Sequence, residues 1–181
     1  MPMNILIVYG THDGQTEKIA HFLAAQMRAQ DRVVDVVNAV RPAPELSLDR
    51  YDTVVIGAPV RMGKYPRAVI DFVRTHRARL EQIPSAFFSV CMAAANPIEA
   101  KRRAAEVWPE RLFKETGWRP RLTAIFAGAL RYTRYNWFIC WLMKRIAKFE
   151  GASTDTTRDH EYTDWEAVSR FAGTVLKSGS T

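Results

Sequence analysis

The residues best suited to bind a ligand form a short polar run near the N-terminus, Thr11-His12-Asp13-Gly14-Gln15-Thr16. The run lies between an apolar segment and a segment with helical periodicity. At the start of a helix, exposed backbone N–H groups and the positive end of the helix dipole favour a phosphate. Thr11 and Thr16 can donate hydroxyl hydrogen bonds to its oxygens, and Gly14 lets the backbone approach closely. The run therefore predicts a phosphate site.

Two phosphate-binding motifs are missing from this run, and their absence restricts the class of ligand that it can bind. The run has no GKT or GKS triplet, which argues against a nucleoside-triphosphate loop, and no GxGxxG, which argues against a dinucleotide site. A single terminal phosphate fits better. The alternative is that Thr16 or Asp13 merely caps the helix. His12 adds positive charge or faces solvent, and the Asp13 carboxylate is expected to brace the loop's own N–H groups, because it would repel a phosphate.

Two further loops follow apolar segments. Residues 58–65 read Ala-Pro-Val-Arg-Met-Gly-Lys-Tyr, and residues 89–97 read Ser-Val-Cys-Met-Ala-Ala-Ala-Asn-Pro. In a doubly wound sheet, loops at the carboxyl ends of neighbouring strands lie side by side, and ligands bind there at the switch point. We expect these two loops and the phosphate run to converge on one crevice.

The elements that must position these loops alternate between strands and helices. Apolar runs predict strands at residues 5–9, 33–40, 53–58, 85–92 and 122–129. Apolar spacing predicts helices at residues 15–29, 66–80, 98–114 and 164–176. Thr163 is the expected N-cap of the last helix, with Glu166 at the capping-box position. The pattern predicts an α/β fold with a doubly wound, five-stranded parallel sheet in the order 2-1-3-4-5.

Length and composition indicate one domain over residues 1–181, because 181 residues with 48% hydrophobic content suffice for one core. Residues 130–162 form an insertion between the fifth strand and the last helix, far longer than an ordinary loop of about 2–6 residues. Cys91 and Cys140 have no disulfide-framework or metal-ligand spacing, and we expect no metal site. The N-terminus has no signal-peptide pattern, so a cytoplasmic location is expected.

The net charge of +7 points to an anionic partner, which is a nucleic acid, a lipid surface or an acidic small molecule. No nucleic-acid-binding motif accompanies the charge, so we expect no nucleic-acid partner. Residues 130–149 are basic and aromatic and contain no acid. At helical spacing, residues 136–149 place tryptophans and basic residues on one arc and apolar residues on the other. This pattern is typical of a helix in a lipid headgroup layer or of one packed on the core, and it is too short to span a bilayer.

The loops together make the chain resemble the flavodoxin superfamily, through T-x-D-G-Q-T, the G-A-P-V-R-M-G-K-Y loop and the long C-terminal insertion. Further segments are similar to the quinone-linked protoporphyrinogen IX dehydrogenase family of bacterial haem synthesis. They are residues 13–16, 55–58, 84–87, 118–120, 127–132, 134–135 and 162–165. Two features depart from that family: Met62 and Pro66 alter the second loop, and residues 94–96 supply no basic side chain before Pro97.

The resemblance implies a flavodoxin-like fold that holds FMN, with the phosphate at residues 11–16 and the ring between residues 60–65 and 90–96. The implied cofactor-binding residues are Thr11, His12, Asp13, Gly14, Gln15, Thr16, Val60, Arg61, Met62, Gly63, Tyr65, Cys91, Met92 and Ala93. Tyr65 is expected to stack on the flavin or to be a surface aromatic of the next helix. Cys91 is expected to be a buried small hydrophobe rather than a redox thiol.

The same resemblance implies FMN-dependent oxidation of protoporphyrinogen IX to protoporphyrin IX, with electrons passing to menaquinone or ubiquinone on the cytoplasmic face of the inner membrane. Residues expected to contact substrate or membrane are Arg131, Tyr132, Arg134, Tyr135, Trp137, Trp141, Lys144 and Arg145. No side chain declares itself a general acid or base, and the oligomeric state is open. The alternatives are a flavodoxin-type electron carrier, an NAD(P)H-dependent quinone reductase and a flavin-free interaction module.

Overall fold

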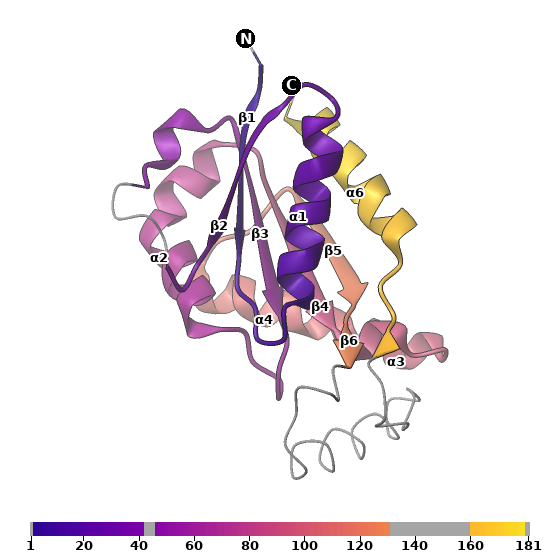
Figure 1. Cartoon of the computed structure of the whole chain (residues 1–181). Helices are drawn as coiled ribbons and strands as arrows, with labels where there is room; N and C mark the ends of the chain where they lie inside the picture. The colour runs from indigo at the N-terminus through magenta and orange to yellow at the C-terminus, as the bar shows by residue number, and fades with distance from the viewer. Residues whose placement is uncertain (1, 42–45, 131–159, 180–181) are drawn as a thin grey trace.

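The computed structural model describes residues 2–41, 46–130 and 160–179 (Figure 1). Most of the predicted insertion, residues 131–159, therefore lies outside the described residues.

A five-stranded parallel sheet forms the centre of the fold. Its strands are β1 (Asn4–Tyr9), β2 (Val33–Asn38), β3 (Thr53–Pro59), β4 (Ser85–Cys91) and β5 (Leu122–Ala127). Their order is β2-β1-β3-β4-β5, and every neighbouring pair is parallel, which confirms the predicted fold. The continuous apolar runs arise because β1, β3 and β4 are buried along almost their whole length.

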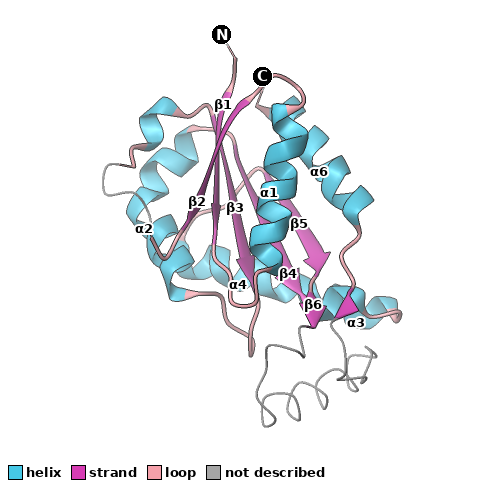
Figure 2. Cartoon of the chain, viewed as in Figure 1, coloured by secondary structure: helices cyan, strands magenta, loops and turns pink. Residues whose placement is uncertain are grey.

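Helices cover both faces of the sheet (Figure 2). On one face α1 (Gln15–Arg28) packs beside α6 (Trp165–Ser178), and on the other lie α2 (Arg67–Gln82) and α4 (Val107–Thr116). Shorter pieces are the 3-10 turns η1 (Leu48–Arg50), η2 (Met92–Ala95) and η3 (Ala104–Glu106), and the helix α3 (Glu99–Arg103). Two apolar clusters, one on each face, form the core.

Two sequence predictions about helices are wrong. The single helix expected over residues 98–114 is divided into α3, η3 and α4. Pro109 contributes to this break, because it has no N–H for the carbonyl of residue 105. The N-cap of α6 is Asp164, whose carboxylate accepts a hydrogen bond from Ala167 N at 3.0 Å, and not Thr163. The Thr163 hydroxyl instead donates to the carbonyl of Ala127 at 2.8 Å.

A two-stranded antiparallel ribbon follows the main sheet. It pairs β6 (Ala129–Leu130) with β7 (His160–Glu161). Tyr162 N donates to Gly128 O at 3.1 Å and extends this contact toward α6. The predicted strand over residues 122–129 is therefore two strands, and the second brings the start and the return of segment 131–159 together.

The contact between β3 and β4 leaves no room for a side chain at Gly57. A Cβ atom there would lie 2.0 Å from Cζ of Phe88, whose ring is fully buried. We expect Gly57→Ala to lower the free energy of unfolding by about 2 kcal/mol or more, because the overpacked core must shift. In Gly173→Ala, the matched control in α6, the new methyl meets no atom within 4 Å. It should raise stability by about 0.5–1 kcal/mol, because alanine favours helix. Urea unfolding measures both, and equal effects would contradict this packing.

Candidate functional site

The three loops predicted to bind a ligand follow β1, β3 and β4, whose carboxyl ends lie at the same edge of the sheet (Figure 1). Gly10 N donates to Gly57 O at 2.9 Å, which joins the first loop to β3. Val60 N donates to Val90 O at 2.8 Å, which joins the second loop to β4. The structure thus brings the three loops together around the switch point, where an open α/β sheet binds its ligand.

The phosphate run forms a tight turn into α1. Gly14 is the N-cap with φ of 86°, a left-handed conformation that suits glycine, and this residue has no side chain with which to cap the helix. Gly14, and not Thr16 or Asp13, therefore occupies the N-cap position of α1. Thr11 Oγ1 accepts a hydrogen bond from Gly14 N at 2.9 Å. The first-turn N–H groups of a helix have no intrahelical partner, so this turn is built to receive an anion.

Among the other side chains of the run, some are exposed to solvent and some are buried. His12 is exposed, as expected for a solvent-facing residue, whereas Gln15 and Thr16 are 5% and 1% exposed. Tyr9, just before the run, donates its hydroxyl hydrogen bond to Glu17 at 2.8 Å. Burial, aided by this hydrogen bond, raises the pKa of Tyr9 to about 12. The phenol therefore stays protonated at neutral pH and ties the end of β1 to the first turn of α1.

A polar cluster connects α1 to the return strand β7, and sequence reasoning missed it. Gln15 Nε2 donates to Thr163 Oγ1 at 2.9 Å, and Lys18 Nζ lies 2.6 Å from Glu161 Oε2. Trp165 Nε1 donates to Glu161 Oε1 at 2.8 Å, and Lys18 lies 5.1 Å from the centroid of the Trp165 ring. Although desolvation opposes it, hydrogen bonds from Lys18 and Trp165 hold the pKa of the Glu161 carboxyl below its usual value. The only sequence signal for this cluster was the family-like segment 162–165.

The second loop contains a two-residue hairpin turn. Arg61 and Lys64 exchange backbone hydrogen bonds of 3.0 Å in both directions. The central residues Met62 and Gly63 have φ of 48° and 73°, as a type I′ turn requires. Met62 is 80% exposed, and a Cβ at Gly63 would lie 2.9 Å from the Trp108 ring of α4. The turn is therefore held against α4 at Gly63 and presents an apolar side chain at its tip.

Tyr65 ties the end of the second loop to the sheet. Its hydroxyl lies 2.8 Å from Ser89 Oγ, and its ring packs edge-to-face on Phe87 at a centroid distance of 5.6 Å. Burial raises the pKa of the Tyr65 phenol well above its usual value, so the hydroxyl stays protonated. The ring is partly buried against the core, and Tyr65 precedes α2 rather than lying on it. Stacking on a flavin stays a prediction.

The third loop starts at Cys91, which is buried and forms no disulfide within the described residues, as expected for a small hydrophobe. Met92 and Ala93 open the turn η2, which Asn96 N closes by donating to Ala93 O at 3.1 Å. Asn96 is 2% exposed, and its Oδ1 accepts a hydrogen bond from Ile98 N at 2.9 Å. The turn η2 thus places three alanines after Met92 at the carboxyl end of β4.

The residues predicted to contact substrate or membrane fall outside the described residues; they are Arg131, Tyr132, Arg134, Tyr135, Trp137, Trp141, Lys144 and Arg145. The structure nevertheless fixes the two ends of their segment. Leu130 pairs with His160, beside the contact of Thr163 with Gln15. The segment therefore leaves and returns next to the phosphate loop.

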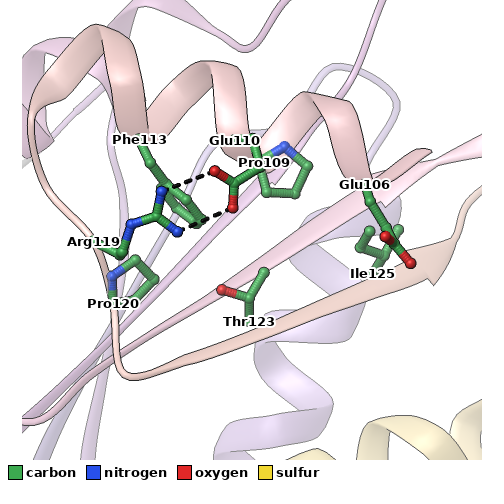
Figure 3. Close-up of a pocket in the computed structure, with 8 residues that line it drawn as sticks. All are labelled: Glu106, Pro109, Glu110, Phe113, Arg119, Pro120, Thr123 and Ile125. Carbon is green, nitrogen blue, oxygen red and sulfur yellow. Dashed lines mark hydrogen bonds and ion pairs between the residues drawn. The ribbon is translucent and has the colours of Figure 1, made fainter. Parts of the chain in front are cut away.

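A cavity of about 550 Å³ lies away from the three loops, between α4 and β5 (Figure 3). Two hydrogen bonds of 3.1 and 2.8 Å join Arg119 to Glu110 across its wall. Its lining residues are Glu106, Pro109, Glu110, Phe113, Arg119, Pro120, Thr123 and Ile125. None of these belongs to the predicted site.

Among the described helices, none has the length and apolar content needed to cross a membrane.

Comparison with known proteins identifies the family to which this chain belongs. A family model described as a flavodoxin domain matches residues 6–157. A curated relative from Escherichia coli strain K12, named protoporphyrinogen IX dehydrogenase (quinone), is 41% identical over 170 residues, 94% of this chain and 93% of its own. A relative of the same name from Leishmania major is 38% identical over 168 residues, 92% of this chain and 72% of its own. The chain belongs to the protoporphyrinogen IX dehydrogenase family of flavodoxin domains.

Solved structures agree on the fold of this flavodoxin domain. Oxidised flavodoxin 1 from Bacillus cereus is similar with a TM-score of 0.55 and 18% identity, covering 96% of this chain and 97% of its own. A flavodoxin from the domain Archaea is similar with a TM-score of 0.52 and 14% identity, covering 99% and 100%. Membership of the flavodoxin domain family makes FMN the cofactor of the crevice, as the sequence predicts. The glycine N-cap of α1, and a buried oxygen of Gln15 without a partner in the described residues, fit such a ligand.

The turn at Met62 stores strain that a substitution can release. A non-glycine residue in the left-handed region costs about 1–2 kcal/mol, and asparagine tolerates this region better than methionine does. We expect Met62→Asn to raise the free energy of unfolding of the FMN-free protein by about 1 kcal/mol. The control Met62→Leu keeps the penalty and should leave stability unchanged. Urea denaturation measures both, and the same stability for the two variants would contradict strain at this turn.

Proposed function

We propose that this protein is an FMN-dependent oxidoreductase that dehydrogenates protoporphyrinogen IX to protoporphyrin IX and delivers the electrons to a membrane quinone. One observation carries the proposal: over almost its whole length the chain is similar to relatives that bear the name of this dehydrogenase. The described crevice supports it, because the loops after β1, β3 and β4 meet where a flavodoxin domain holds its cofactor.

The chain's own groups hold and orient the cofactor. The N–H groups at the start of α1 bind the FMN phosphate, with the positive end of the helix dipole behind them. Backbone groups of residues 60–65 and 91–93 surround the ring's polar edge, and the contact between Tyr65 and Ser89 fixes the second loop to β4. When bound, FMN supplies the redox chemistry by accepting electrons from the porphyrinogen and passing them to the quinone. Within the described residues we assign no general acid or base.

The porphyrinogen is proposed to bind beside the paired strands β6 and β7. Arg131 and Arg134 follow β6 directly and carry the charge needed to pair with the substrate's propionates. Tyr132 and Tyr135, interleaved with these arginines, supply rings that can stack on pyrrole rings. The support is sequence order alone: the residues lie within six positions of β6, whose partner strand β7 contacts Lys18 of α1 through Glu161.

The proposed reaction makes a direct prediction. FMN-loaded protein, kept anaerobic with protoporphyrinogen IX and either menaquinone or ubiquinone, should form porphyrin faster than the spontaneous rate, as followed by porphyrin fluorescence. Omitting the quinone should prevent sustained porphyrin formation, because one bound flavin accepts only part of the electrons that full oxidation to porphyrin releases. A plain electron carrier would give no quinone-dependent porphyrin, and an NAD(P)H-linked quinone reductase would oxidise NADPH instead. No acceleration by protein with bound FMN would overturn the proposed activity.

We also propose that the protein works at the cytoplasmic face of the inner membrane, where its quinone acceptor lies. The support is the composition of residues 130–149, which carry five basic residues, two tryptophans and no acid. Each basic residue near an anionic lipid surface contributes about 1 kcal/mol of attraction, and tryptophan favours the headgroup layer. This segment starts at Leu130, which pairs with His160 beside the start of α1, so attachment here would bring the flavin site to the membrane.

Charge reversal tests the membrane proposal. Lys144→Glu combined with Arg145→Glu should weaken binding to phosphatidylglycerol vesicles at least about tenfold in flotation assays, because two attractions become repulsions. The control combines Arg121→Glu with Lys177→Glu, two exposed residues at the amino-terminal edge of the sheet, and makes the same change in net charge. Equal losses in the two variants, or equal binding to vesicles without anionic lipid, would contradict a specific membrane surface.

A further inference from the structure

One buried acceptor in the cofactor crevice is left without a donor. Gln15 is the first residue of α1 and is only 5% exposed. Its amide nitrogen donates to Thr163 Oγ1 at 2.9 Å, whereas its Oε1 has no hydrogen-bond partner within the residues that the structure describes. Buried polar atoms are nearly always hydrogen-bonded, and an unsatisfied one calls for a specific explanation.

The orientation of the Gln15 amide follows from the hydrogen bonds of Thr163. The single hydroxyl proton of Thr163 is donated to Ala127 O at 2.8 Å, so toward Gln15 the hydroxyl oxygen can only accept. The amide nitrogen must therefore face Thr163, because the reversed amide would place one acceptor against another. The Glu161 carboxylate, which the Gln15 amide also approaches, favours the same orientation. The amide oxygen is thus fixed as the unpartnered atom.

Contacts from two side chains hold the Glu161 carboxylate in place, so this carboxylate can orient the Gln15 amide. One carboxylate oxygen lies 2.6 Å from Lys18 Nζ, and the other accepts from Trp165 Nε1 at 2.8 Å. The Trp165 ring packs on Phe22 of α1 at a centroid distance of 4.8 Å. These contacts join β7 and the start of α6 to the first two turns of α1.

The chemistry of the cofactor decides which group completes the hydrogen bonding of Gln15. The FMN phosphate is an acceptor at neutral pH and is served by the N–H groups of the helix start. The ribityl chain next to the phosphate carries hydroxyl groups, which donate. We propose that Gln15 Oε1 accepts a hydrogen bond from a ribityl hydroxyl of FMN, and that Thr163 and Glu161 are positioning residues that hold the amide for it. This inference rests on the assignment of FMN to the crevice.

Three flavins separate a ribityl contact from a phosphate contact. FMN carries both groups, riboflavin has the ribityl chain without the phosphate, and lumiflavin lacks both. We expect Gln15→Leu to weaken binding of FMN and of riboflavin to the FMN-free protein by the same factor, about tenfold, as for loss of one hydrogen bond. Lumiflavin binding should not change. Quenching of flavin fluorescence on titration measures all three dissociation constants.

The positioning residues are tested with the same titrations. Thr163→Val removes the hydroxyl that orients Gln15, and it should reproduce the pattern of Gln15→Leu with a smaller loss. The matched control is Thr174→Val, which removes an exposed hydroxyl that bonds only Arg170 O within α6, and it should leave all three constants unchanged. Glu161→Gln should weaken FMN and riboflavin binding, whereas Glu166→Gln, at a 91% exposed side chain nearby, should not.

The other possible results of these titrations would each contradict the inference in a different way. Loss of FMN affinity with unchanged riboflavin affinity in Gln15→Leu would overturn the ribityl contact in favour of the phosphate. Unchanged affinity for both flavins would show that a water molecule satisfies Gln15, and it would equally overturn the inference. Failure of the unaltered protein to bind FMN or riboflavin would overturn the cofactor assignment itself. Urea unfolding of each variant separates loss of the fold from loss of binding.

Discussion

The first-turn N–H groups of α1 need hydrogen-bond acceptors, and helix geometry prevents the backbone of the helix from supplying them. In most helices a side chain at the N-cap meets part of this need, whereas here the N-cap is Gly14 and has no side chain. The turn is narrow because Thr11 Oγ1 holds Gly14 N, and Tyr9 and Glu17 join the strand before it to the helix after it. Much of the surrounding structure serves to keep this open helix start in one place.

The parallel sheet supplies the first part of that support. A strand buried on both faces cannot shift its register without exposing apolar side chains, so the end of β1 is fixed relative to β3 and β4. Gly57 permits the close packing of Phe88, and Tyr65 secures the second loop to Ser89 of β4. The second part comes from the far end of the chain, where Thr163 and Glu161 hold the first turns of α1 against β5 and β7.

The sequence predicted those features that depend on local pattern. Apolar runs identified all five strands of the sheet, and glycine within a polar run identified the turn into α1. Features that depend on distant partners were not predictable. Cap preference alone favours Thr163 as well as Asp164, and the choice is made by the carbonyl of Ala127, 36 residues away. Trp108 against Gly63, and Gln15 against Thr163, likewise arise only when the sheet brings separate loops together.

Three departures from ordinary structural rules lie in the loops at the carboxyl edge of the sheet. A helix begins without a side-chain cap at Gly14, a methionine occupies the left-handed region at the tip of a turn, and a buried amide oxygen at Gln15 has no donor within the described structure. Each departure is unfavourable to the folded chain alone, and the first and last are relieved by a ligand that offers phosphate oxygens and hydroxyl protons together. Sequence similarity identifies the family, whereas the features at Gly14 and Gln15 are structural observations made without it. A phosphate and a hydroxyl-bearing chain are joined in the side chain of FMN, so one cofactor can meet both requirements.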